Sequence, residues 1–152
     1  MTSDCGSLVT GSVIPLNIAP NAFLTSEKQA TALVIGAMGY INVQIKSALR
    51  RLGYDIVLAE NVEDVGQLIT NHDYQYVILD LNIPTPHEGL RMLDDLKKSA
   101  ILHDLSFKII AMSCGGSCAH LQQEAVGRGA DQFLWRENDW QNRLSRFIEA
   151  AR

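Results

Sequence analysis

The sequence predicts an α/β protein built on a doubly wound, five-stranded parallel sheet. Residues 76–79 are apolar at every position and run directly into Asp80. Such a run is typical of a strand covered on both faces, as in the centre of a parallel sheet. From residue 31 onward, five short apolar segments alternate with five segments whose apolar residues have helical spacing. Right-handed crossovers between such segments place helices on both faces of the sheet, and ligands then bind at the strands' carboxyl ends, where Asp80 lies.

The length, charge and cysteine content of the chain argue against several classes of protein. The chain has 152 residues, which suits one domain, and its net charge is −4 without a long basic run. This balance argues against direct nucleic-acid binding. No apolar stretch approaches the roughly 20 residues of a membrane span, and the first residues lack the basic start of a signal peptide. Three cysteines, an odd number, do not suit a disulfide framework and favour a cytoplasmic location.

The first 29 residues differ from the rest of the chain. They are rich in Ser, Thr, Gly, Asn and Pro and contain one short apolar piece at residues 12–16. We interpret residues 1–29 as a largely irregular extension that can pack a few residues onto the domain, and residues 30–152 as the domain itself.

The first half of the domain contains two strands and two helices. The expected strands cover residues 32–35, which end at Gly36, and residues 54–58. The intervening helix has one apolar face, formed by Ile41, Ile45, Ala48, Leu49 and Leu52. Gly53 is placed to close this helix as a left-handed cap. Asn61 can cap the second helix, whose apolar residues are Val62, Val65, Leu68 and Ile69.

The second half continues the alternation from the strand that ends at Asp80. A helix is expected at residues 89–98, with Leu90, Leu93 and Leu96 facing inward. Further strands are expected at 107–112 and 132–135. Ser117 can cap a helix that runs to about residue 128. The last helix, residues 140–151, has an apolar face of Leu144, Phe147 and Ile148.

Several residues occur at mutually consistent spacing along these elements. They are Asp80 within Ile-Leu-Asp-Leu-Asn-Ile-Pro, Gly89, Ser113 after Ile-Ile-Ala-Met, Gly129-Ala130-Asp131, Phe133 and Arg136. Over residues 30–152 this pattern resembles the receiver domain of two-component response regulators. The resemblance implies a CheY-like, flavodoxin-type sheet with strand order 2-1-3-4-5. It also implies that Asp80 is the phosphoacceptor, that Ser113 and Arg136 contact the phosphoryl oxygens, and that Phe133 is the switch aromatic.

The sequence departs from the receiver pattern at the metal site. Receivers carry two acidic residues after the first strand, and Gly36 and Ala37 stand there instead. Phosphoryl transfer to a carboxylate needs a divalent cation to balance the anions, and Mg²⁺ needs several oxygen ligands. We therefore predict no metal or other cofactor, with Mg²⁺ involved only if Asp80 is phosphorylated. Arg136 replaces the family's lysine, and Glu137 could draw it into a local pair away from Asp80.

These features predict a degenerate receiver, or pseudo-receiver, that signals mainly by protein–protein interaction and is not an enzyme. Its partner would be a histidine kinase or another signalling protein. Phe133 and Trp135 lie on one side of the fifth strand, where receivers bind partners or form homodimers through helix 4, strand 5 and helix 5. A core position is the alternative for Trp135 and the favoured one for Trp140. The main functional alternative is a phosphorylatable receiver that uses Asp80 as its phosphoacceptor.

Two other patterns suggest different chemistry. Gly36 and Gly39 follow the first strand, and Glu60 ends the second, as in dinucleotide-binding domains, but Asn42 replaces the third glycine. A tight turn in place of the lost acidic pair is the favoured explanation of the two glycines. Cys114 and Cys118, with His120 nearby, could bind a metal, but their spacing fits an ordinary loop better. Cys114 could also react as a redox-sensitive thiol near Arg136.

Overall fold

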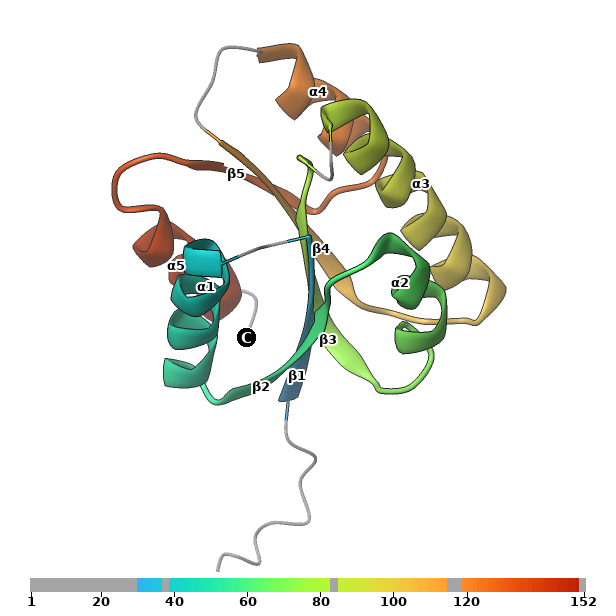
Figure 1. The fold of residues 1–152 in the computed structure, drawn as a ribbon, viewed down its shortest axis with the longest axis horizontal. Helices are drawn as coiled ribbons and strands as arrows, with labels where there is room; N and C mark the ends of the chain where they lie inside the picture. Colours follow the sequence, from blue (N-terminus) through green and yellow to red (C-terminus); the bar gives the residue numbers. More distant parts are fainter. Residues whose placement is uncertain (1–29, 37–38, 83–84, 115–118, 151–152) are drawn as a thin grey trace, which may run out of the picture.

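The computed structural model describes residues 30–36, 39–82, 85–114 and 119–150. The predicted extension, Ala37, the Ser117 cap and Cys118 lie outside the described residues. The ten elements along the chain are β1 (Ala30–Ile35), α1 (Gly39–Arg51), β2 (Tyr54–Ala59), α2 (Val62–Leu68), β3 (Tyr74–Asp80), α3 (Pro86–Leu102), β4 (Lys108–Cys114), α4 (Ala119–Gly127), β5 (Gln132–Arg136) and α5 (Trp140–Ala150). Strands and helices therefore alternate as predicted (Figure 1).

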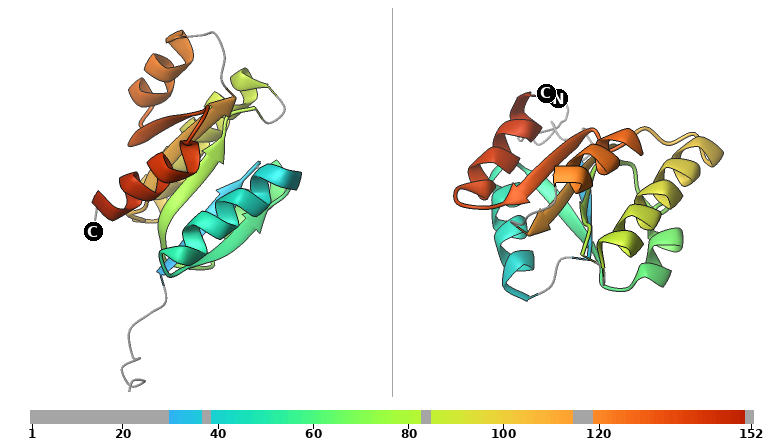
Figure 2. Two further views of the ribbon diagram at one scale, coloured as in Figure 1. Left: turned by 90° about the vertical axis from the view of Figure 1, so that its left-hand side faces the viewer. Right: turned by 90° about the horizontal axis from the view of Figure 1, so that it is seen from above.

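The five strands form one parallel sheet in the order β2-β1-β3-β4-β5, which confirms the predicted topology. Helices α1 and α5 cover one face, and α2, α3 and α4 cover the other (Figure 2). The chain winds outward in opposite directions from β1 and β3, so these two central strands mark the switch point of the sheet. None of the helices in the described part of the chain is long and apolar enough to cross a membrane.

Strand β3 lies in the middle of the molecule and is buried on both faces. Val77 and Leu79 pack into the core beneath α2, α3 and α4, whereas Tyr76 and Ile78 pack beneath α1 and α5. Successive side chains of a strand point to opposite faces, so an unbroken apolar run is needed where both faces are covered. This burial explains the sequence pattern that ends at Asp80.

Helix α1 is closed by Gly53 as predicted, whereas the side-chain cap predicted for the start of α2 is not formed. Gly53 has a φ of +87°, and its amide donates to the Arg50 carbonyl, as expected of a left-handed cap. Asn61 holds the N-cap position of α2, but its side chain makes no capping hydrogen bond. The Asn61 amide group instead donates to the Asp64 carboxylate at 3.4 Å, which explains why the predicted cap does not form.

Helix α3 is longer at both ends than the predicted 89–98. It begins at Pro86, and the Thr85 hydroxyl accepts a hydrogen bond from the Glu88 amide at the N-cap. Threonine at the N-cap followed by proline at N1 is a strong start signal, which apolar spacing alone does not reveal. The last turn exposes Ile101 and Leu102 to solvent, so the inward-facing pattern ends before the helix does.

Gly89 lies in the first turn of α3, where the helix passes very close to the chain after β3. A Cβ atom at this position would lie only 2.0 Å from the Leu81 carbonyl oxygen. Backbone cannot move aside as a flexible side chain can. The absence of a side chain at residue 89 therefore allows α3 to pack beside the Asp80 segment.

We expect Gly89→Ala to destabilise the fold by about 2–4 kcal/mol, the cost of overpacking against fixed backbone. Gly66→Ala in α2 is the matched control, because a Cβ atom there meets nothing within 4 Å. Alanine should be neutral or stabilising by up to about 1 kcal/mol at that helical position. Urea unfolding of both variants measures the difference, and equal stabilities would contradict the close-approach explanation.

Candidate functional site

The carboxyl ends of β3, β4 and β5 bring together three of the predicted site residues. Asp80 pairs in register with Met112, so Ser113 and Cys114 extend one and two residues further along β4. On the other side of β4, Cys114 is the register partner of Arg136. The sheet register thus places Asp80, Ser113 and Arg136 at one edge, as the sequence predicted.

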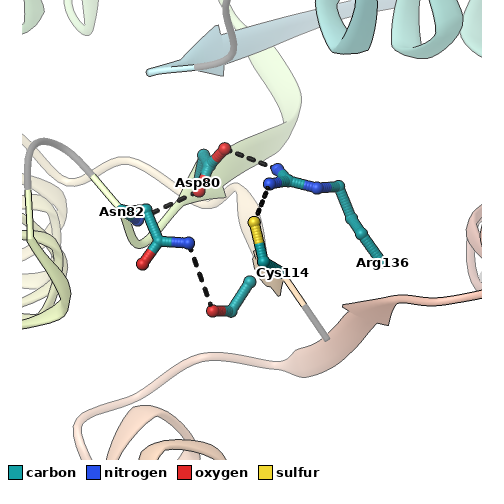
Figure 3. A network of polar contacts seen from close by, with 5 residues as sticks. Asp80, Asn82, Cys114 and Arg136 are labelled. Atoms are coloured by element: carbon teal, nitrogen blue, oxygen red, sulfur yellow. Dashed lines mark hydrogen bonds and ion pairs between the residues drawn. The ribbon is translucent and has the colours of Figure 1, made fainter. Parts of the chain in front are cut away.

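Arg136 forms an ion pair with Asp80 across the intervening strand (Figure 3). Its Nη1 donates to Asp80 Oδ2 at 2.6 Å, and both side chains are only 10% exposed. The prediction that Glu137 could draw Arg136 away is wrong. Glu137 is solvent-exposed, where a charge pair gains little, whereas the nearly buried Asp80 carboxylate requires a cation beside it.

The surroundings of Arg136 keep its guanidinium charged. Burial alone would lower the pKa of Arg136, but the hydrogen bond and charge of Asp80, with a smaller contribution from Cys114, outweigh burial and raise it. A raised pKa means that the stabilising effect of this charge is fully present at neutral pH. It is lost only as the pH rises through the strongly alkaline pKa of the folded state.

The second oxygen of Asp80 is held by the chain that follows β3. Asp80 Oδ1 accepts a hydrogen bond from the Asn82 backbone amide at 3.0 Å, and the Asn82 side-chain amide donates to Ser113 Oγ at 3.4 Å (Figure 3). Asn82 was missed by the sequence analysis. The available signal was an aspartate at a strand end, whose carboxylate often accepts from the amide two residues later. Ser113 is linked to Asp80 through Asn82, and its phosphoryl-binding role stays a prediction.

The described residues do not fit a Mg²⁺ ion. No group of three or more His, Cys, Asp or Glu residues that could hold a metal gathers in the described ranges. Gly36 is buried at the end of β1, and its amide donates to the Ala59 carbonyl. Glu60 follows β2, two strands from β3, and is exposed. Each Asp80 oxygen already accepts one hydrogen bond, so a metal would have to share this carboxylate with Arg136 and Asn82, and no cluster of acidic ligands accompanies it in the described residues.

The aromatic residues of β5 connect this site to α4. Phe133 and Trp135 pack edge to face, with ring centroids 4.8 Å apart, and Phe133 is buried in the core. Trp135 is half-buried, and its Nε1 donates to Gln122 Oε1 of α4 at 3.2 Å. Trp140, the first residue of α5, is buried in the core that α1 and α5 share, which confirms the core position favoured for it. The interface role of Phe133 and Trp135 stays a prediction.

The glycine turn after β1 is explained by backbone geometry. Gly36 and Gly39 have φ values of +84° and +52°, a region that other residues rarely adopt. The alternative of dinucleotide binding stays a prediction. The proposed metal loop has its Cys118 outside the described residues, whereas Cys114 is an exposed free thiol.

The fold and the site together define a class of protein: a CheY-like α/β domain with an aspartate at the end of β3 and a cation at the end of β5. The model of the response regulator receiver domain family matches residues 38–147, most of the chain. The chain therefore belongs to the response regulator receiver domain family. Members are two-component signalling modules that interact with kinases and other signalling partners.

Solved structures show the same fold. A response regulator from Thermotoga maritima superposes with a TM-score of 0.67 at 16% sequence identity, covering 81% of this chain and 97% of that one. A two-component response regulator from Clostridium difficile gives 0.68 at 19% identity, covering 80% and 94%. The chemotaxis response regulator CheY4 of Vibrio cholerae gives 0.66 at 16% identity, covering 82% and 100%. No curated protein matches the chain in a sequence search.

Because the Asp80–Arg136 pair is nearly buried, we expect Arg136→Met to cost about 3 kcal/mol of stability by leaving the carboxylate uncompensated. Combining it with Asp80→Asn should recover part of this loss. In the double-mutant cycle, the interaction energy between the two side chains should exceed about 1 kcal/mol. Urea unfolding at pH 7 gives the free energy of unfolding of the parent, the two single variants and the double variant.

The matched control is the Arg128–Asp94 pair, which has a similar distance of 2.8 Å but side chains that are 33% and 42% exposed. Arg128→Met with Asp94→Asn should show a coupling of at most about 1 kcal/mol. Additive effects at Asp80 and Arg136 would contradict a significant charge pair at the site.

Proposed function

We propose that this chain is a pseudo-receiver that signals mainly through protein–protein contact, with weak or absent Mg²⁺-dependent phosphorylation of Asp80. The observation that carries the proposal is the occupancy of both Asp80 oxygens by groups of the protein itself. Arg136 neutralises one oxygen at 2.6 Å, and the Asn82 amide binds the other at 3.0 Å. The module has no catalytic step of its own in this proposal.

The charge balance supports this proposal. A phosphoryl group and a carboxylate are both anionic, so their approach requires a cation that contacts both. A magnesium ion at this edge would find one carboxylate, already paired with a guanidinium, and no cluster of three or more metal-binding side chains in the described residues. A single charge of Arg136 would then have to serve both Asp80 and the incoming phosphoryl group, which weakens the reaction.

The face formed by α4, β5 and α5 is the proposed docking surface. Trp135 connects β5 to α4 through Gln122, and the nearby Val126 of α4 is 51% exposed. A signalling partner such as a histidine kinase, or a second copy of the chain, would bind here. We place the module in the cytoplasm, where its three cysteines would stay reduced.

Phosphoryl chemistry is tested by adding beryllofluoride, a phosphoryl mimic, with Mg²⁺ and recording amide spectra of the full chain. We expect no saturable shifts centred on Asp80, because the acidic pair that would hold Mg²⁺ is absent from the sequence and Asp80 is paired with Arg136. Asp80→Ala is the negative control, and a receiver with an intact acidic pair is the positive one. Saturable shifts that disappear in Asp80→Ala would favour the alternative, a phosphorylatable receiver with Asp80 as the phosphoacceptor.

The docking face is tested by sedimentation equilibrium of two valine variants. Val126→Glu on α4 should weaken self-association at least about tenfold, because it places a charge inside the proposed interface. Val62→Glu on α2 is the matched control, since Val62 is similarly exposed, at 45% against 51% for Val126. Equal effects of both variants would rule out the α4–β5–α5 face as the dimer contact.

A further inference from the structure

Arg136 reaches Asp80 over a third residue, Cys114. Arg136 ends β5 and Asp80 ends β3, with β4 between them, so the two side chains meet across two strand spacings, about 10 Å. Cys114 is the last residue of β4 and the register partner of Arg136. Arg136 Nη2 donates to Cys114 Sγ at 2.7 Å while Nη1 donates to Asp80 (Figure 3). The Cys114 sulfur therefore contacts the guanidinium on its way from β5 to Asp80, at the end of the strand that lies between them.

The chemistry of arginine explains why a second acceptor is needed. A guanidinium carries five donors in a rigid fork, whereas a lysine ammonium is a compact group that can turn toward one partner. The Arg136 side chain is 10% exposed, so little water reaches its donors, and a buried donor without a partner is costly. Cys114 accepts a hydrogen bond from Nη2, the terminal nitrogen that does not donate to Asp80, and this second contact fixes the orientation of the fork.

The three side chains differ in their access to solvent. Asp80 and Arg136 are nearly buried, whereas Cys114 is exposed. A reagent from solution therefore reaches the sulfur more readily than the ion pair. A group added to this sulfur would compete for the space beside it that Arg136 Nη2 occupies.

We propose that Cys114 is the positioning residue that holds Arg136 on Asp80, so that the chemical state of its thiol regulates how firmly Asp80 is neutralised. This inference rests on the proposed function, in which the Asp80–Arg136 pair takes the place of metal-dependent chemistry. A free thiol holds the guanidinium in place. A capped thiol releases Nη2 and leaves the guanidinium attached to Asp80 through one hydrogen bond.

The test uses the full chain carrying Cys5→Ser and Cys118→Ser, which leaves Cys114 as the only one of the three cysteines. Nitrogen-detected spectra of the Arg136 guanidinium report how fast it rotates about its Nε–Cζ bond, and Arg136→Lys assigns the signal. Cys114→Val removes the acceptor at similar volume, and Cys114→Ser retains one. Neither Mg²⁺ nor a phosphoryl mimic is present, so the result is independent of the beryllofluoride experiment.

We expect rotation of Arg136 to become roughly fivefold faster in Cys114→Val, the factor that corresponds to one lost hydrogen bond, and to stay near the parent rate in Cys114→Ser. Arg143 is the internal control, because its Nη2 donates to the Trp135 carbonyl at 3.1 Å and should not change. An unchanged Arg136 rate in Cys114→Val would overturn the positioning role.

Capping of the folded parent, the chain with Cys5→Ser and Cys118→Ser, gives an independent measurement that needs no substitution at Cys114. N-ethylmaleimide adds the thiol across its carbon–carbon double bond, forming an S–C bond and placing the proton on the adjacent carbon. The adduct should speed up rotation of the Arg136 guanidinium, as Cys114→Val does, and should leave the rotation of Arg143 unchanged. An adduct that leaves the Arg136 rate unchanged would overturn the regulatory role of the thiol.

Discussion

The site depends on the ion pair between Asp80 and Arg136. A carboxylate that is 90% removed from solvent is tolerated only if a cation or several donors compensate its charge. Arg136 supplies that charge at 2.6 Å, and the Asn82 amide completes the shell of hydrogen bonds at 3.0 Å. Together with the hydrogen bonds from Asn82 to Ser113 and from Arg136 to Cys114, these contacts tie the ends of β3, β4 and β5 to one another. Any input that alters one strand end therefore has a physical route to the other two.

The parallel sheet explains why residues so distant in sequence can meet. Every crossover returns the chain to the same edge, so the strands all end on one side of the molecule. The register then sets the detail: Asp80 lies opposite Met112, and Cys114 lies opposite Arg136. A shift of one residue would turn each of these side chains to the other face of the sheet. The apolar cores on both faces fix the register and so position the charged edge.

The sequence predicted the sheet well because its signals are local. The apolar run before Asp80 and the cap at Gly53 each follow from a few adjacent residues. The partners of Arg136 could not be obtained in this way, because Asp80 is 56 positions away and the choice between it and Glu137 depends on burial. Spacing alone also failed at the N-terminus of α3, where Thr85 and Pro86 determine the first turn.

In the pseudo-receiver that we propose, the absence of the acidic pair, where Gly36 and Ala37 stand, changes which inputs can operate the site. A ligand shifts a conformational equilibrium only through a difference in its affinity for the two states. Where acidic residues gather, Mg²⁺ and a phosphoryl group supply that difference together. Here the carboxylate and the guanidinium already sum to zero charge, so adding an anion gains little unless Arg136 first leaves Asp80. The effective inputs for such a site are those that compete for the guanidinium or move the strand that carries it. In this proposal, a protein that binds beside β5, or a change at Cys114, would act on these contacts directly.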